Sequence, residues 1–242
     1  MSDYEERTYR KRIRAEGLVS YNVRIKETDL YVSSDRDLHE ETTDLVFDYR
    51  YQIESYIKSH PEFLTTLKPY PEDPYAPAII NDMIMSTRDI GVGPMASVAG
   101  AIAQYVGLDL LESTAQVIVE NGGDIFLKVN RQVTVSVLAG DSPLSDRIGL
   151  SIPTRVMPLG VCSSSGRVGH SLSLGSVDVI TILSTSAIRA DGAATSIGNR
   201  IRTKTDLEKV AEWAAAIDGI LGGIAIMADR MITWGDVELV DL

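Results

Sequence analysis

Apolar segments separated by very short turns recur along the chain, and they constrain the fold more than any other feature. A link of two to five residues favours antiparallel neighbours, because parallel strands need a crossover of a dozen or more residues. The turns hold Gly, Asn and Asp, which suit tight reversals. The predicted hairpin pairs are 18–26 with 30–32 across 27–29, 115–119 with 125–129, 125–129 with 133–139 across Asn130-Arg131, and 224–228 with 231–234.

Segments with helical periodicity lie between these hairpins. Apolar residues recur at spacings of three, four and seven from about 36 to 59, and His60-Pro61 ends that helix because the residue before proline disfavours the α region. Pro94 suits the first position of a helix to about Val106, whose small residues predict unusually close packing. The remaining expected elements are strands at 79–85, 177–183 and 237–240, a helix at 190–200, and a helix opened by a Thr205–Glu208 capping box and running to about 217.

Hairpins mixed with helices indicate an α+β class and not a regular βαβ array. The 242 residues are enough to bury a large core without a disulfide or metal staple, and we expect one domain over 1–242 with an N-terminal arm at about 1–16. The arm holds a basic stretch that is more typical of a solvated segment than of a binding motif. Its basic residues are Arg7, Arg10, Lys11, Arg12 and Arg14.

The net charge and the cysteine content indicate which partners and which cellular compartment to expect. A formal net charge of −11 argues against nucleic acid as a general partner. The single Cys162 fits a reducing compartment and is expected to be a small buried side chain. The first residues hold no apolar leader and no run approaches 18 apolar residues, so we expect a cytoplasmic protein without a membrane partner. We also expect a homodimer, since twofold dimers are the commonest oligomers.

The sequence VENGGDI at 119–125 places two glycines and an acid between two apolar strands. One interpretation is a hairpin turn in which Gly123 takes a positive φ. The other is a backbone that closely approaches a flat ligand, with Asn121 or Asp124 hydrogen-bonding its polar edge. Both interpretations stay open on spacing alone.

The segment CSSSGRVGHS at 162–171 is the second candidate site. Its serines and consecutive backbone amides suit an anion nest, although a polar surface turn has the same composition. His170 is the best general-base candidate because the pKa of histidine lies near neutrality, although a lone histidine is more often structural. His39 and His60 lie on or beside the long helix and are expected to be surface or capping residues. The chain has no GxxxxGK[ST] motif, which argues against a P-loop nucleotide site.

Asp191 and Thr195 are four residues apart, so they share one face of the predicted helix. Their carboxylate and hydroxyl suit a hard cation, which prefers oxygen ligands. The alternative is an N-terminal acid favoured by the helix dipole, followed by a surface threonine.

Taken together, VENGGDI, the SSSG segment, His170 and ADGAAT resemble the ApbE superfamily of magnesium-dependent flavin transferases. The sequence is most similar to an uncharacterised cytoplasmic branch that shares the strings HPEF, GVGPMASVAG, SSSGRVGHSLS and ADGAAT. Similarity to the branch covers most of the chain, whereas similarity to the transferases is confined to about residues 85–200.

The resemblance implies an ApbE-like domain with a mixed, largely antiparallel sheet flanked by helices. It implies transfer of FMN from FAD to a Ser or Thr of an acceptor protein, with release of AMP and with help from Mg²⁺. The implied site residues are Asn121, Gly122, Gly123 and Asp124 beside the flavin, Ser164, Ser165 and Gly166 near the ligand, His170 as base, and Asp191 with Thr195 as metal ligands.

Two departures from the transferase pattern keep other functions open. The segment GVGPMASVAG lacks the lysine that the transferases usually carry there, and SLSLGS replaces the Pro-Arg-Thr-Gly turn after the histidine. The first hypothesis is therefore a flavin- or nucleotide-handling enzyme of the transferase type. The second is a non-catalytic binder of a small anionic or pterin/flavin-like ligand. The third is an assembly protein that uses the small-residue helix 94–106 as an interface.

Overall fold

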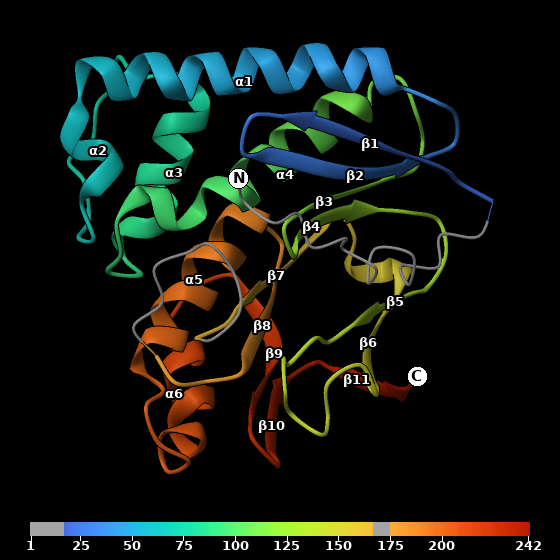
Figure 1. Cartoon of the computed structure of the whole chain (residues 1–242), viewed down its shortest axis with the longest axis vertical. Coiled ribbons are helices and arrows are strands. Elements are labelled where there is room, and N and C mark those ends of the chain that lie inside the picture. The colour runs from blue at the N-terminus through green and yellow to red at the C-terminus, as the bar shows by residue number, and fades with distance from the viewer. Residues whose placement is uncertain (1–16, 167–174) are drawn as a thin grey trace.

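The computed structural model describes residues 17–166 and 175–242 and is built around one eight-stranded antiparallel sheet (Figure 1). The strand order is β1-β2-β3-β4-β7-β8-β9-β10, and a second sheet has the order β11-β6-β5. The large sheet contains β1 Val19–Ile25, β2 Thr28–Ser34, β3 Val117–Asn121, β4 Asp124–Lys128, β7 Leu159–Ser164, β8 Val179–Ser184, β9 Ile220–Met227 and β10 Arg230–Gly235. The small sheet contains β5 Val133–Ser136, β6 Ile148–Ile152 and β11 Glu238–Asp241.

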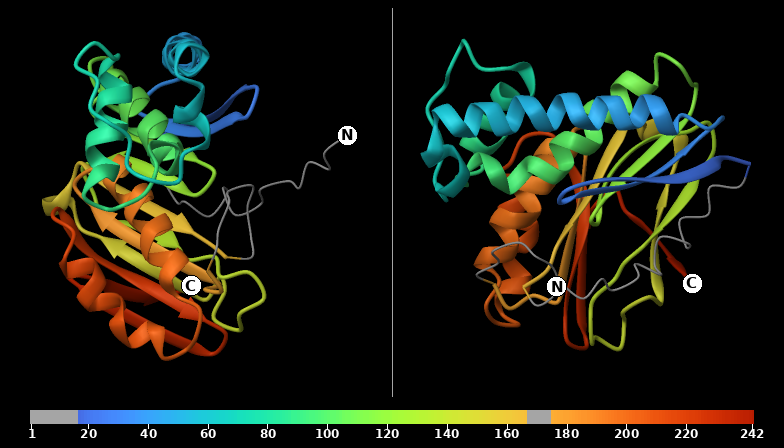
Figure 2. Two further views of the ribbon diagram at one scale, coloured as in Figure 1. Left: turned by 90° about the vertical axis from the view of Figure 1, so that its left-hand side faces the viewer. Right: turned by 45° about the horizontal axis from the view of Figure 1, so that its top comes forward.

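Helices cover one face of the large sheet, and the small sheet covers the other. Figure 2 (right) shows α5 on one side of β7–β9 and β5 and β6 on the other. The α-helices are α1 His39–Ser59, α2 Pro61–Thr65, α3 Ala78–Arg88, α4 Val98–Leu110, α5 Ala187–Arg200 and α6 Val210–Ala215. The 3₁₀ turns are η2 Pro94–Ser97, η3 Thr154–Val156 and η4 Asp206–Lys209.

Strand alternation explains why the protein has two separate hydrophobic cores. Successive side chains point to opposite faces, so Val119 and Phe126 join the core beneath the helices, whereas Ile118 and Ile125 join the core beneath the small sheet. The central strands β3, β4, β7 and β8 are therefore buried on both faces, whereas the edge strands β1 and β10 are largely exposed. This confirms the α+β class and the sheet flanked by helices.

The predicted close approach at the small-residue helix is confirmed between α4 and α5. A Cβ at Gly100 would lie 2.4 Å from the carbonyl oxygen of Ala187, and one at Gly160 on β7 would lie 2.3 Å from the Cα of the same residue. Such distances are too short for any side chain. Glycine therefore sets the separation at which α4, α5 and β7 pack.

The prediction of a strand at 79–85 was wrong, because this segment lies in α3. Ile79, Ile80, Met83 and Ile84 are fully buried at helical spacing. A short apolar run does not distinguish a buried helix from a buried strand by periodicity alone.

Several predicted boundaries also need correction. The first hairpin turns at Lys26-Glu27, where Lys26 has a φ of 53°, and Thr28 is already in β2. Pro94 opens a 3₁₀ turn, and α4 continues to Leu110. The helix predicted at 190 begins three residues earlier, after the N-cap Ser186.

The predicted capping box at Thr205 and the hairpin across Asn130-Arg131 are both absent. Thr205 makes no side-chain cap bond, while a carboxylate oxygen of Asp206 accepts the amide of Thr203 at 2.9 Å. The helix expected to reach 217 is instead η4 followed by the short α6. After residues 130–131 the chain leaves the large sheet, since β4 pairs with β3 and β7 while β5 pairs with β6. No helix among residues 17–166 and 175–242 has the length and apolar character needed to cross a membrane.

Candidate functional site

The NGGD segment is a two-residue turn between β3 and β4, as one interpretation predicted. Gly122 and Gly123 have φ values of 70° and 107°, a region that side chains rarely adopt. The amide of Gly123 donates to Oε1 of Glu120 at 2.8 Å. The turn thus places Asn121 and Asp124 opposite each other at the ends of adjacent strands.

Asn121 and Asp124 both lie on the helix-covered side of the sheet. The side-chain amide of Asn121 donates to the carbonyl of Ala99 at 3.1 Å, which links the turn to the start of α4. Asp124 is buried, and across the β4–β7 pair it lies opposite Cys162. Cys162 is itself fully buried, as predicted, and its thiol donates to the carbonyl of Ala187 at 3.3 Å.

Asp191 approaches the same place from α5. Its Oδ2 accepts the backbone N–H of Gly100 at 2.9 Å, so this carboxylate satisfies an amide in the first turn of α4. Negative charge is favoured at a helix N-terminus, where unpaired amides and the helix dipole converge. Thr195 lies one turn further along α5 and is partly buried.

Burial dominates the electrostatics of the two carboxylates. It raises the pKa of Asp191 to about 7, while hydrogen bonds from the amides of Gly100 and Ala99 oppose the increase. Burial also raises the pKa of Asp124 well above its usual value, and the neighbouring charge of Asp191 adds to that increase. Asp191 is therefore close enough to Asp124 to disfavour the ionised form of Asp124.

The Ser-Gly segment is only partly a loop. Cys162, Ser163 and Ser164 belong to β7, so the prediction of a loop with an anion nest was wrong for these three residues. The hydroxyl of Ser163 lies 2.9 Å from that of Thr181, on the small-sheet side. Ser164 points the other way, with its Oγ 3.7 Å from where a Cβ on Gly198 of α5 would lie.

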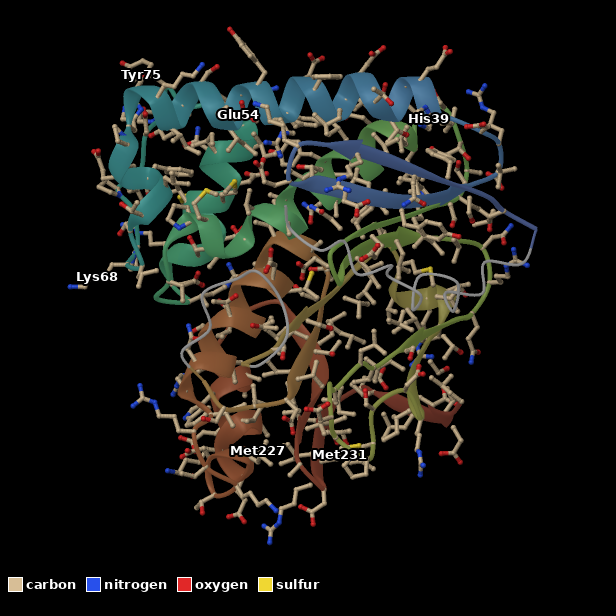
Figure 3. All side chains as sticks on the ribbon, in the orientation of Figure 1. His39, Glu54, Lys68, Tyr75, Met227 and Met231 are labelled. Carbon is tan, nitrogen blue, oxygen red and sulfur yellow. The ribbon has the colours of Figure 1, made fainter. Side chains whose placement is uncertain are left out.

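His170 lies outside the described residues, but Gly166 and Gly175, which flank that segment, are both placed. The amide of Gly166 donates to the carbonyl of Val177 at 2.9 Å, and a Cβ on Gly175 would lie 2.0 Å from the carbonyl oxygen of Gly198. The two residues that flank this segment therefore lie near the C-terminal half of α5. His39 is the exposed first residue of α1 (Figure 3), and His60 is the C-cap of that helix and stacks on Tyr56.

The structure brings Asn121, Asp124 and Asp191 together; Thr195 lies further along α5, and Ser164 of β7 faces the C-terminal half of that helix. The amides of Ala99 and Gly100 were not predicted as part of the site, although the run of small residues in GVGPMASVAG was a signal for them. No group of three or more His, Cys, Asp or Glu side chains in the described ranges is arranged to hold a metal. Mg²⁺ does not require one, since it is usually held by one or two carboxylates together with water and ligand phosphates.

Comparisons with known proteins agree with this architecture. The family model described as AbpE bacteria matches residues 10–230. A UPF0280 protein of Methanocella arvoryzae is 37% identical over 212 residues, covering 87% of this chain and 86% of its own length. One from Methanococcus vannielii is 41% identical over 186 residues, or 75% of each chain.

Two solved structures show the same fold at low sequence identity. The apo form of the flavinyl transferase ApbE of Pseudomonas stutzeri has a TM-score of 0.57 at 12% identity and covers 90% of this chain and 93% of its own. The ApbE protein of Thermotoga maritima has a TM-score of 0.55 at 11% identity, with 89% and 96% covered. The chain therefore belongs to the AbpE bacteria family and has the fold of the ApbE flavin transferases.

Proposed function

We propose that the protein binds FAD, or a related flavin nucleotide, together with Mg²⁺ and acts as an FMN transferase. An acceptor Ser or Thr hydroxyl of a partner protein would form a phosphoester with FMN, the diphosphate bond of FAD would break, and AMP would leave. Bound Mg²⁺ would supply a positive charge that stabilises the transferring phosphate. The hydroxyl proton would pass to His170 as general base.

The carrying observation is that three segments far apart in sequence converge on one face of the large sheet. Asp124 from the NGGD turn lies opposite Cys162 at the start of the Ser-Gly segment, and Asp191 of α5 interacts with Asp124. A structural role alone would not require two buried carboxylates at one place, because burying like charges is unfavourable without compensation. This supports a site for a cation and an anionic ligand.

The proposed roles follow from these positions. Asp191 and Thr195 would hold the metal, and Ser164, Ser165 and Gly166 would contact the ligand near the C-terminal half of α5. Asn121, Gly122, Gly123 and Asp124 would contact the flavin, the two glycines allowing close approach of the backbone.

One observation favours the non-catalytic binder as a second candidate. Asp191 accepts the amide of Gly100 and so supports the start of α4 whether or not a metal binds. A binder would keep this carboxylate for stability, and the segment GVGPMASVAG offers no lysine to clamp a phosphate. It would bind a flavin- or pterin-like anion without turnover and without a requirement for Mg²⁺.

Thermal unfolding tests the proposal. FAD at about 100 times its Kd should add about 2.7 kcal/mol to the free energy of unfolding, or roughly 5–11 °C in Tm for a chain of this size, and only with Mg²⁺ present. Asp191→Asn keeps an oxygen for the Gly100 amide but should abolish the Mg²⁺-dependent shift. Thr195→Val should reduce the shift, whereas Thr195→Ser should retain it. An unmoved Tm at saturating FAD and Mg²⁺ would refute the proposal.

We further propose that the protein is a cytoplasmic homodimer with a separate acceptor protein as partner. Cys162 is a free, buried thiol, which fits a reducing compartment. Light scattering after size-exclusion chromatography should give twice the chain mass of 26.4 kDa, and a monomer mass would refute the dimer.

A further inference from the structure

The carboxylate of Asp124 contains an oxygen for which the surrounding protein supplies no donor. The residue is only 7% exposed, and its Oδ1 has no hydrogen-bond partner within the described part of the chain. Buried polar atoms are nearly always hydrogen-bonded, and an unpartnered carboxylate oxygen is among the least favourable exceptions. The unpartnered oxygen therefore indicates that a ligand binds to Asp124.

The donors around Asp124 leave this one oxygen unpartnered. The side-chain amide of Asn121 donates to Ala99, and the amide of Gly123 donates to Glu120. The thiol of Cys162, which also donates to the carbonyl of Ala187, and the backbone amide of Ser163 interact with the Asp124 carboxylate and lower its pKa, but burial outweighs them. Oδ1 itself accepts no hydrogen bond within the described residues.

The group that acts on Asp124 from α5 is another acid. Asp191 interacts unfavourably with Asp124, and its own Oδ2 is held by the amide of Gly100. Two carboxyl groups from different elements thus lie together in a buried place that disfavours their ionised forms. A divalent cation would stabilise both as carboxylates and takes oxygen ligands, whereas a further neutral donor would satisfy only one oxygen.

We propose that Asp124 is a second carboxylate ligand of the divalent cation, together with Asp191. This rests on the proposed metal site at Asp191 and Thr195, and it assigns Asp124 to the metal instead of to the edge of the flavin. Asp124 begins β4 directly after the Gly122-Gly123 turn, so the cation links the large sheet to α5.

The test measures Mn²⁺ binding by electron paramagnetic resonance with the full chain and without flavin, because bound Mn²⁺ loses the signal of the free ion. The wild-type protein should bind Mn²⁺, and Asp124→Asn should raise the Kd for Mn²⁺ at least about tenfold. Asp178→Asn is the matched control, since Asp178 is a buried acid directly before β8 whose Oδ2 accepts the amide of Ala228, and asparagine keeps an oxygen for that amide. It should change the Kd by less than about twofold, and Asp124→Ser replaces Asp124→Asn if the latter does not fold.

A second measurement separates a metal ligand from a structural residue. Without divalent cations, Asp124→Asn removes a buried ionisable group whose Oδ1 has no partner and should keep or raise the Tm, whereas replacing a structural carboxylate would lower it. Wild-type binding with an unchanged Kd in the Asp124 variants would overturn this inference and leave the site at Asp191 intact. Absence of Mn²⁺ binding by the wild-type protein, with and without FAD, would overturn both proposals.

Discussion

Gly100 offers the sharpest test of how α4 and α5 pack. An added Cβ would lie 2.4 Å from the carbonyl oxygen of Ala187 and 2.9 Å from the Cβ of Asp191. The first contact is with backbone, so no rotamer change relieves it and the two helices must separate. Overpacking of this kind costs about 3 kcal/mol, and alanine regains about 1 kcal/mol in helix propensity. The net loss for Gly100→Ala is therefore about 2 kcal/mol.

The assay is urea unfolding followed by circular dichroism, supported by thermal unfolding. A loss of about 2 kcal/mol corresponds to roughly 4–8 °C in Tm at this chain length. Gly192→Ala in α5 is the matched control, because its added Cβ would meet side-chain carbons and no backbone, the nearest being a methyl group of Thr87 at 3.2 Å. The reasoning would be refuted if Gly100→Ala were as stable as Gly192→Ala, since the close approach of α4 and α5 would then have no energetic consequence.

Three further predictions concern other parts of the molecule. Glu54 (labelled in Figure 3) accepts a hydrogen bond from Lys26 at 2.6 Å and another from Arg50 at 2.7 Å, and the bond from Lys26 is the largest cause that lowers its pKa. Glu54→Gln should therefore lower the free energy of unfolding by about 0.2–1 kcal/mol at pH 7, measured by urea titration. The difference from wild type should vanish as the pH falls through the lowered pKa of Glu54, because the carboxyl group is then neutral in both states. An equal loss at all pH values would contradict an ionic origin. Burial raises the pKa of Cys162, so a thiol reagent such as DTNB should react with this residue only at the rate of unfolding, and rapid labelling of the native protein at pH 8 would contradict its burial. Phe126→Ala should cost about 3–5 kcal/mol in the same titration, because this ring is 2% exposed and packs against Gly107 of α4; a loss below 1 kcal/mol would contradict that packing.

The sequence predicted local structure better than it predicted pairing. The NGGD turn, the end of α1 at Pro61 and the strand near 177–183 depend on residues close in sequence, and each was identified correctly. The pairing of Asp124 with Cys162 joins segments almost forty residues apart, and no local pattern specifies it. The same limit explains the wrong hairpin at Asn130-Arg131, since a short turn does not reveal that the chain changes sheets there.

The candidate site shows the same division between residue identity and environment. Asp124, Asp191 and Thr195 were chosen from residue type, spacing and resemblance, yet burial and the missing partner of Asp124 emerge only from the packed structure. The small-residue run predicted close packing at Gly100, but it did not predict the hydrogen bond from Gly100 to Asp191. A one-dimensional pattern gives the chemistry available at a position, whereas the local dielectric and the hydrogen-bond balance depend on elements brought together from elsewhere.

The bond between Gly100 and Asp191 joins the stability of the helical layer to the proposed chemistry. Because Asp191 satisfies an amide of α4, any variant that removes its oxygen atoms perturbs both the helix start and the metal site. Asp124 differs, since its Oδ1 accepts no hydrogen bond within the described residues. In the metal-free protein Asp191→Ala should therefore lower the Tm, whereas Asp124→Asn should maintain or raise it, and both variants should bind the cation more weakly. These opposite changes in Tm would show that Asp191 serves both the fold and the metal site, whereas Asp124 serves the metal site.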